Sequence, residues 1–202
     1  MLALTVFCLP AAHGAGDTIV VVGDSLSSGY GIGADQSWVA MLAEAVRSEG
    51  YGDRVVNASI AGDTSSGGLA RLPRLLEQHD PKLVIIELGG NDGLRGQPVG
   101  MLRDNLRKMI ALARESGAEV VLAGMRIPPN YGQTYTNQLA AIYPELAAEH
   151  DATLIEFLLE GVALHGELMQ PDGIHPNAAG QKIVFANVWR VLEPLLRARD
   201  GG

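Results

Sequence analysis

Three residues that could act together as a nucleophile, a base and a carboxylate lie far apart in the sequence. Ser25 follows an apolar run and a Gly-Asp pair, whereas Asp172 and His175 lie three residues apart near the C-terminal end. A serine hydroxyl is a poor nucleophile until a neighbouring base removes its proton, and that base is usually a histidine oriented by a carboxylate. These residues therefore predict a catalytic triad of Ser25, His175 and Asp172.

Two further positions could stabilise the oxyanion that forms when a nucleophile attacks a carbonyl. Gly62, in SIAGDTS, offers an unobstructed backbone N–H, and Asn91, in GGND, offers a side-chain NH₂ group. The amide of Ser25, at the start of a helix, would be a third donor. Asp24 and Asp63 are expected to fix the adjacent turns by local hydrogen bonds. Each candidate alone also has a structural explanation, such as a helix N-cap or an Asx turn, so the prediction depends on their joint occurrence.

Apolar, β-rich segments alternate with segments of helical periodicity. We expect strands at residues 18–22, 54–60, 83–88, 119–123 and 153–157, and helices at about 37–48, 64–78, 99–115, 135–150 and 177–196. Near-continuous apolar runs such as VVV and VIIEL are typical of strands buried on both faces. The repeated βα units predict an α/β fold with a parallel sheet covered by helices on both faces. The candidate residues follow the predicted strands and should meet at the carboxyl edge of the sheet, where such folds bind ligands.

The composition excludes several other classes of protein. The 202 residues carry a formal net charge of −8, whereas nucleic-acid binding needs clustered Lys and Arg. The only cysteine is Cys8, which excludes a cysteine nucleophile or a zinc–cysteine site in the predicted domain. No His, Asp and Glu set has metal-ligand spacing. We therefore expect no metal, no cofactor and no nucleic-acid partner, and a monomer that acts on a small molecule.

The first 14 residues differ from the rest of the chain. They contain no charge, are apolar through Ala12, and end in Ala12-His13-Gly14. This stretch is shorter than the roughly 20 apolar residues that span a bilayer, but it suits a secretory signal with small residues at its cleavage site. No Lys or Arg precedes it, which leaves an N-terminal extension as the alternative. We expect a signal peptide over residues 1–14, a single domain over residues 17–198, and a periplasmic or secreted protein without stable membrane insertion.

Four short blocks of the sequence resemble the signature of a known family. GDSLS near the start, the glycine of SIAGDTS, GGND and the late DGIHP are similar to the blocks of the GDSL, or SGNH, hydrolases. Longer stretches such as VIIELGGNDGLRG and IPPNYG resemble the periplasmic thioesterase, lysophospholipase and arylesterase subgroup of Gram-negative bacteria. The similarity covers essentially the whole chain after Gly16.

This resemblance implies a fold, a chemistry and a set of roles. The fold would be flavodoxin-like, with three α/β/α layers and a five-stranded parallel sheet. The chemistry would be metal-independent hydrolysis of carboxylic esters and thioesters through an acyl-enzyme. By position, Ser25 matches the nucleophile, Asp172 and His175 match the other triad members, and Ser25, Gly62 and Asn91 match the oxyanion donors.

The substrate is less closely defined by the sequence. We expect the acyl group to lie near Leu94, Ile127, Pro129 and Tyr131, and the alternative is that Leu94 and Tyr131 only pack the loop. In the resembling subgroup the segment after the asparagine is a mobile loop that closes over acyl chains. Here Gly93 and Gly96 flank Leu94 and would permit such a hinge.

Two other functions remain open at this point. A related SGNH enzyme could deacetylate carbohydrates, although aromatic platforms for sugars are lacking near the predicted site. A flavodoxin-like module could instead bind phosphate or flavin after the first strand. That alternative leaves Gly62, Asn91, Asp172 and His175 unexplained.

Overall fold

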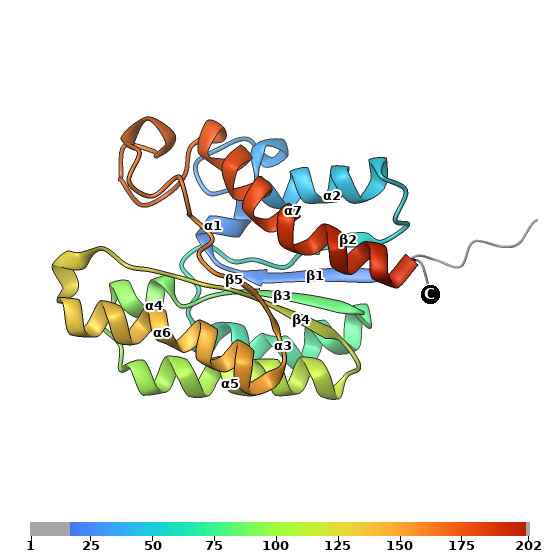
Figure 1. Ribbon diagram of the computed structural model, residues 1–202, viewed down its shortest axis with the longest axis horizontal. Coiled ribbons are helices and arrows are strands. Elements are labelled where there is room, and N and C mark those ends of the chain that lie inside the picture. The colour runs from blue at the N-terminus through green and yellow to red at the C-terminus, as the bar shows by residue number, and fades with distance from the viewer. Residues whose placement is uncertain (1–16, 201–202) are drawn as a thin grey trace, which may run out of the picture.

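The computed structural model describes residues 17–200, in which five parallel strands form one sheet (Figure 1). The strands are β1 Thr18–Gly23, β2 Arg54–Asn57, β3 Leu83–Glu87, β4 Glu119–Ala123 and β5 Thr153–Ile155. Their order across the sheet is β2-β1-β3-β4-β5, and every neighbouring pair is parallel. The expected signal peptide over residues 1–14, with Cys8, lies outside the described residues.

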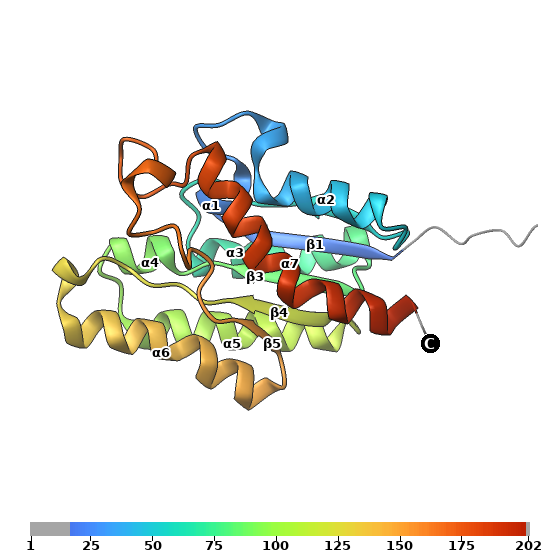
Figure 2. The same ribbon diagram turned by 45° about the horizontal axis from the view of Figure 1, so that its top comes forward.

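Helices cover both faces of the sheet. They are α1 Ser25–Ser28, α2 Trp38–Ser48, α3 Ser65–His79, α4 Gly90–Leu94, α5 Val99–Glu115, α6 Gln133–His150 and α7 Ala178–Asp200, with 3₁₀ turns η1 Ala34–Gln36, η2 Pro129–Tyr131 and η3 Gly166–Leu168. Helices α2 and α7 pack on one face, and α3, α5 and α6 pack on the other (Figures 1 and 2). This arrangement confirms the predicted three-layer α/β/α fold. Over residues 17–200, none of the helices has the length and apolar character needed to span a bilayer.

The centre of the sheet supplies most of the core. All six residues of β1 and all five of β3 are buried, as expected for strands covered on both faces. The apolar residues Ile19 to Val22 are 0% exposed. Fully burying one such aliphatic side chain stabilises the folded state by about 1.5–3 kcal/mol. The central strands β1 and β3 are therefore fully buried, and they give a rigid support to the residues that directly follow them.

The strand order reverses direction at β1. From β1 the chain crosses to β2 on one side and then to β3 on the other. In sheets of this kind ligands bind outside the carboxyl ends of the strands at the reversal point. Ser25 follows β1 and Asn91 follows β3, so both candidates lie at this point.

The expected elements agree closely with the structure in the core and less closely at its edges. The bounds of β4 and α5 are those expected, whereas β2 and β5 are shorter than expected. Strand β2 ends at Asn57, whose side-chain oxygen accepts a hydrogen bond from the Ser59 N–H (3.1 Å), and Ile60 is 53% exposed. Helix α1 begins at Ser25, where a helix start was expected, but it has only four residues; α4 was not expected, because it has five residues and no apolar periodicity.

A buried tyrosine fixes the end of β3. Tyr143 on α6 is 0% exposed and its hydroxyl donates to the carbonyl oxygen of Leu88 at 3.0 Å. Gly89 has a φ of +119°, and a Cβ at this position would lie 2.1 Å from the Tyr143 hydroxyl. The hydroxyl therefore occupies the space beside the turn that leads from β3 to Asn91.

Replacing this hydroxyl should destabilise the fold measurably. Tyr143→Phe leaves the buried Leu88 carbonyl without its donor, so we expect the free energy of unfolding to fall by about 1–3 kcal/mol in urea titrations. The control is Tyr131→Phe, at a position 40% exposed, which should change that free energy by less than about 0.5 kcal/mol. Equal effects of the two substitutions would show that the hydroxyl of Tyr143 contributes nothing specific.

Candidate active site

The three residues of the predicted triad meet at the carboxyl edge of the sheet. The Nε2 atom of His175 lies 2.7 Å from the Oγ atom of Ser25, and its Nδ1 atom lies 2.7 Å from the Oδ2 atom of Asp172. The histidine thus joins a hydroxyl on one side to a carboxylate on the other. This arrangement is the one in which a histidine acts as a base toward a serine.

The loop that carries Asp172 and His175 is shaped by the same carboxylate. Its Oδ1 atom accepts hydrogen bonds from the backbone N–H groups of Ile174 (2.9 Å) and His175 (3.0 Å). Gly173 has a φ of +66°, a conformation that glycine adopts without strain. The loop is closed by the Gln170 N–H, which donates to the His175 carbonyl at 2.7 Å. One carboxylate therefore both folds the loop and orients the imidazole.

These contacts also determine the charge of Asp172. Partial burial by itself would raise the pKa of this carboxyl. The hydrogen bonds from the His175 ring and from the backbone of His175 and Ile174 outweigh it and lower the pKa to about 2. The group is therefore ionised at neutral pH and can stabilise a positive charge on the imidazole ring.

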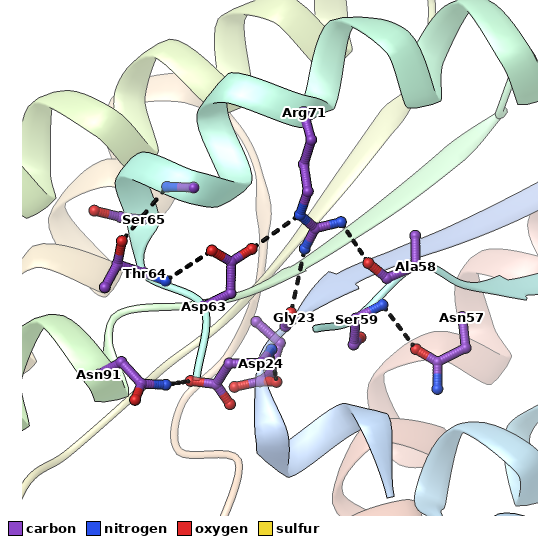
Figure 3. A network of polar contacts seen from close by, with 12 residues as sticks. Gly23, Asp24, Asn57, Ala58, Ser59, Asp63, Thr64, Ser65, Arg71 and Asn91 are labelled. Atoms are coloured by element: carbon purple, nitrogen blue, oxygen red, sulfur yellow. Dashed lines mark hydrogen bonds and ion pairs between the residues drawn. The ribbon is translucent and has the colours of Figure 1, made fainter. Parts of the chain in front are cut away.

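Asp24 connects the nucleophile turn to the turn after β3. It caps α1, because its Oδ1 atom accepts from the Leu26 N–H at 3.0 Å, and Ser25 is the first residue of that helix. This confirms the expected local role of Asp24. Its Oδ2 atom accepts from the Nδ2 atom of Asn91 at 2.8 Å (Figure 3). Ser25 and Asn91 are thus held against each other through one carboxylate.

The predicted oxyanion donors border the same cavity as Ser25. Asn91 and Gly62 both line it. Because an amide NH₂ has two hydrogens, Asn91 keeps one for a ligand while the other bonds to Asp24. Gly62 has a φ of +78°, and its carbonyl accepts from the Nη2 atom of Arg95 at 2.8 Å. The first N–H groups of a helix have no partner within it, which leaves the Ser25 amide available as well.

A buried glutamate beneath the nucleophile turn was not anticipated. Glu87, the last residue of β3, is 0% exposed; its Oε2 atom accepts from the Asp24 N–H (3.1 Å) and the Ser27 hydroxyl (2.5 Å). Its Oε1 atom has no hydrogen-bond partner among the described residues. Burial raises the pKa of Glu87 well above its usual value of 4.5, and the nearby Asp24 carboxyl raises it further. The surroundings of Glu87 therefore favour its neutral form over its ionised form.

The neighbouring Asp24 carboxyl is affected by burial as well. It is 2% exposed, and burial raises its pKa to about 6, against the lowering effect of the hydrogen bonds from Leu26 and Asn91.

The only sign of Glu87 in the sequence is an acidic residue inside the apolar run VIIEL. That sign is visible in retrospect, but it does not show what the carboxyl would contact.

Asp92, also unanticipated, joins two of the turns around the site. It is 1% exposed, and its carboxylate accepts from the backbone N–H (2.8 Å) and the hydroxyl (2.5 Å) of Ser65. Ser65 is the first residue of α3, where a negative charge is favourable. The contact ties the turn that carries Asn91 to the helix that follows Gly62.

A cavity of about 730 Å³ opens beside Ser25 and His175. Of the predicted substrate residues, Leu94, Ile127 and Pro129 line it, whereas Tyr131 does not. Tyr131 ends the 3₁₀ turn η2 and is 40% exposed. Further walls come from residues that sequence reasoning did not select, namely Tyr30, Met125, Phe157, Leu159, Leu164 and Met169. These walls are mainly apolar and suit a hydrocarbon group.

The glycines beside Leu94 have different surroundings. A Cβ on Gly93 would lie 2.7 Å from side-chain atoms of both Ile127 and Leu139, whereas one on Gly96 would meet nothing within 4 Å. Close packing therefore explains why position 93 is a glycine, and the hinge remains a prediction.

Within residues 17–200, no cluster of three His, Cys, Asp or Glu side chains could hold a metal ion.

The buried Glu87 carboxyl should make stability depend on pH. Because its pKa in the folded state lies above the usual value, its stabilising contribution is complete below about pH 4.5 and is lost as the pH rises through the folded-state pKa. Gln is neutral at every pH and has nearly the same shape. We therefore expect Glu87→Gln to raise the melting temperature relative to the wild type more at pH 8 than at pH 4.

A matched control separates this effect from a general change of surface charge. Glu77, on the exposed side of α3, undergoes the same substitution in Glu77→Gln, but its carboxyl is not buried. Its difference from the wild type should be about the same at pH 4 and pH 8. A Glu87→Gln difference that is equally independent of pH would mean that Glu87 is not held neutral.

Comparison with known proteins gives one consistent result. Residues 21–183 match the model of the GDSL-like lipase/acylhydrolase family. Esterase TesA of Pseudomonas aeruginosa is 51% identical over 182 residues, which cover 90% of each chain. Thioesterase 1/protease 1/lysophospholipase L1 of Escherichia coli K12 is 46% identical, with 90% of this chain and 86% of the relative covered. A crystal structure of TesA superposes with a TM-score of 0.86 over 89% of this chain and 99% of the other. The chain therefore belongs to the GDSL-like lipase/acylhydrolase family.

Proposed function

We propose that this member of an ester-hydrolysing family uses Ser25 as the nucleophile of a Ser-His-Asp triad. The observation that carries the proposal is the hydrogen-bonded series from Ser25 Oγ through His175 to Asp172, with 2.7 Å at each of its two contacts. The series lies at an apolar cavity large enough for an acyl group. A phosphate-binding turn would need neither the histidine nor the second carboxylate.

The geometry supports a two-step reaction. His175 takes the proton of the Ser25 hydroxyl as the serine oxygen forms a bond to the acyl carbonyl carbon. The amides of Ser25 and Gly62 and the side chain of Asn91 donate to the resulting oxyanion. The tetrahedral intermediate then collapses, the bond to the alcohol or thiol breaks, and the leaving group takes the proton from His175.

Water completes the cycle by the same route. His175 removes a proton from a water molecule, whose oxygen attacks the acyl-enzyme carbonyl. The carboxylic acid is released and the proton returns to Ser25. Asp172, ionised because of its low pKa, stabilises the imidazolium in both steps. No metal or cofactor takes part in this scheme.

The substrates we propose are carboxylic esters and thioesters with an apolar acyl group. The support is the apolar wall of the cavity, including Leu94, Ile127 and Phe157, together with relatives named esterase and thioesterase/lysophospholipase. The net charge of −8 disfavours nucleic acid as a partner. We further propose that the protein acts in the periplasm or outside the cell, which rests on the sequence of residues 1–14 alone, and that it is a monomer.

Covalent labelling tests the nucleophile directly. A fluorophosphonate probe should label the folded protein, and Ser25→Ala should abolish labelling and lower kcat by at least about 10⁴-fold. The control is Ser28→Ala on the same short helix, where the hydroxyl makes only a 3.5 Å contact to the Ser25 carbonyl. It should be labelled like the wild type. Freshly folded wild-type protein that takes up no probe would overturn the proposal.

A chain-length series tests the substrate class. With p-nitrophenyl esters, we expect kcat/KM to rise from acetate to octanoate by up to about fourfold per methylene buried, since each contributes about 0.8 kcal/mol. Palmitoyl-CoA should also be hydrolysed. Acetylated xylan is the contrasting substrate: a preference for it over the longer esters would favour a carbohydrate deacetylase instead.

A further inference from the structure

The guanidinium group of Arg71 lies behind the site and donates to three acceptors, one at the end of β1 and two in the segment between β2 and α3. Arg71 is on α3 and its side chain is only 20% exposed. Its Nε atom donates to Asp63 Oδ2 (2.9 Å), its Nη2 atom to the Gly23 carbonyl (3.3 Å), and its Nη1 atom to the Ala58 carbonyl (Figure 3). Each nitrogen thus reaches a separate acceptor.

These acceptors surround the two turns that carry the backbone oxyanion donors. Gly23 ends β1 two residues before Ser25, and its carbonyl also accepts from the Ile60 N–H at 3.0 Å. Ala58 directly follows β2, and Asp63 directly follows Gly62. The guanidinium therefore holds the start and the end of the 58–63 loop against the strand that leads to Ser25.

Backbone hydrogen bonds also shape the 58–63 loop: the Ile60 N–H donates to the Gly23 carbonyl and the Asp63 N–H donates to the Ile60 carbonyl, both at 3.0 Å, so that Gly62 lies inside a closed turn. The loop contains no helix or strand. A Cβ placed on Gly62 would meet a single atom within 4 Å, the Nη2 atom of the exposed Arg95 at 3.8 Å. The Asp63 side chain adds two contacts: its Oδ1 atom accepts from the Thr64 N–H at 3.0 Å while its Oδ2 atom accepts from Arg71. The contact between Asp63 and Arg71 therefore anchors the C-terminal end of the turn that carries the Gly62 amide.

From this arrangement we propose that Arg71 is a positioning residue that fixes the Gly62 amide relative to the Ser25 amide. The inference rests on the proposed function, because it assigns a role in stabilising the same oxyanion. Donors stabilise an oxyanion only when they are held close to the productive geometry before the reaction, to within about 0.5 Å. Arg71 itself does not line the cavity, so it acts through the loop and not on the substrate.

The three bonds need the shape of arginine as well as its charge. A guanidinium is planar and presents five donors in a fixed fork, whereas a lysine ammonium is a compact charge on a flexible stem. Lys at position 71 could still pair with Asp63, so the buried carboxylate would keep a cation. It could not hold Asp63 and both carbonyls in the same geometry. Arg71→Lys therefore tests the positioning role while preserving the charge.

Arg71→Lys should separate transition-state stabilisation from substrate binding. We expect kcat on a p-nitrophenyl ester to fall by about 10–100-fold with KM within twofold, since losing one oxyanion donor outright costs about 10²–10³-fold. An alkylboronic acid forms a tetrahedral anionic adduct with an active-site serine. Its inhibition constant should rise by the same factor as kcat falls. If Arg71 served only to stabilise the fold, kcat and the inhibition constant of the boronic acid would not change by the same factor.

The matched control is Arg74→Lys. Arg74 lies on the same helix, three residues further on, and is exposed. It undergoes the same chemical change, and its kcat and boronate affinity should stay within twofold of the wild type. If Arg71→Lys behaves like this control, or if its KM rises while kcat is unchanged, the positioning role is overturned.

A second variant covers the case in which Arg71→Lys does not fold. In Asp63→Asn the amide oxygen can still accept from Thr64, but the charged contact to Arg71 is lost. We expect the same fall in kcat and the same loss of boronate affinity, and an Asp63→Asn enzyme that matches the wild type in both would overturn the inference. Fluorophosphonate labelling of the wild type separates the two proposals: an unlabelled wild type overturns the proposed function, whereas a labelled wild type with unaffected variants overturns only the role of Arg71.

Discussion

The parallel pairing of β1 with β3 is the constraint on which the rest of the site depends. It sets Gly23 opposite Glu87 in register, so the residues after these two strands leave the sheet side by side. Both strands are fully buried, which makes this register costly to change, since a slip of one residue would move every side chain to the opposite face. The nucleophile turn and the turn that carries Asn91 are therefore adjacent before any polar contact forms between them. The hydrogen bond from Asn91 to Asp24 then fixes an arrangement that the sheet has already brought close.

The acidic side chains at this edge are buried or partly buried, and each is stabilised by a different kind of contact. Asp92 is paired with the N-terminus of α3 through Ser65, and Asp63 is paired with Arg71. Glu87 forms no salt bridge within residues 17–200; burial and Asp24 raise its pKa, which favours the neutral form, and its Oε2 atom serves as a hydrogen-bond acceptor. An apolar residue at this position would leave the Ser27 hydroxyl and the Asp24 amide without the acceptor they now share. A buried donor left unsatisfied costs about 1–3 kcal/mol, which is a physical reason for a carboxyl group at the end of a fully buried strand.

The sequence predicted the strand-end residues better than the residues that support them. The apolar runs of β1, β3 and β4 indicate their positions because buried parallel strands have few other patterns. The expected strands at residues 54–60 and 153–157 were too long, since apolar residues such as Ile60 and Phe157 lie in loops, the latter in the cavity wall. Asp172 and His175 are recognisable because one short loop carries both and because Ser25, Gly62 and Asn91 occur at predicted strand ends in the same chain. Arg71 has no such local sign: on a helix its charge looks like that of exposed Arg74, and only the packing of α3 behind the 58–63 loop distinguishes them.

The reacting groups and the cavity walls are held in place by different kinds of contact. Ser25 and Asn91 follow strands of the buried sheet and are linked by hydrogen bonds of defined geometry, so their positions tolerate little change. Much of the apolar wall instead belongs to the irregular segments around residues 125–129 and 157–169, where Leu164 is 96% exposed. Packing between apolar side chains of similar volume is far more tolerant of substitution than a network of buried hydrogen bonds. The fold therefore allows the shape of the acyl site to vary while the chemistry at the sheet edge stays the same.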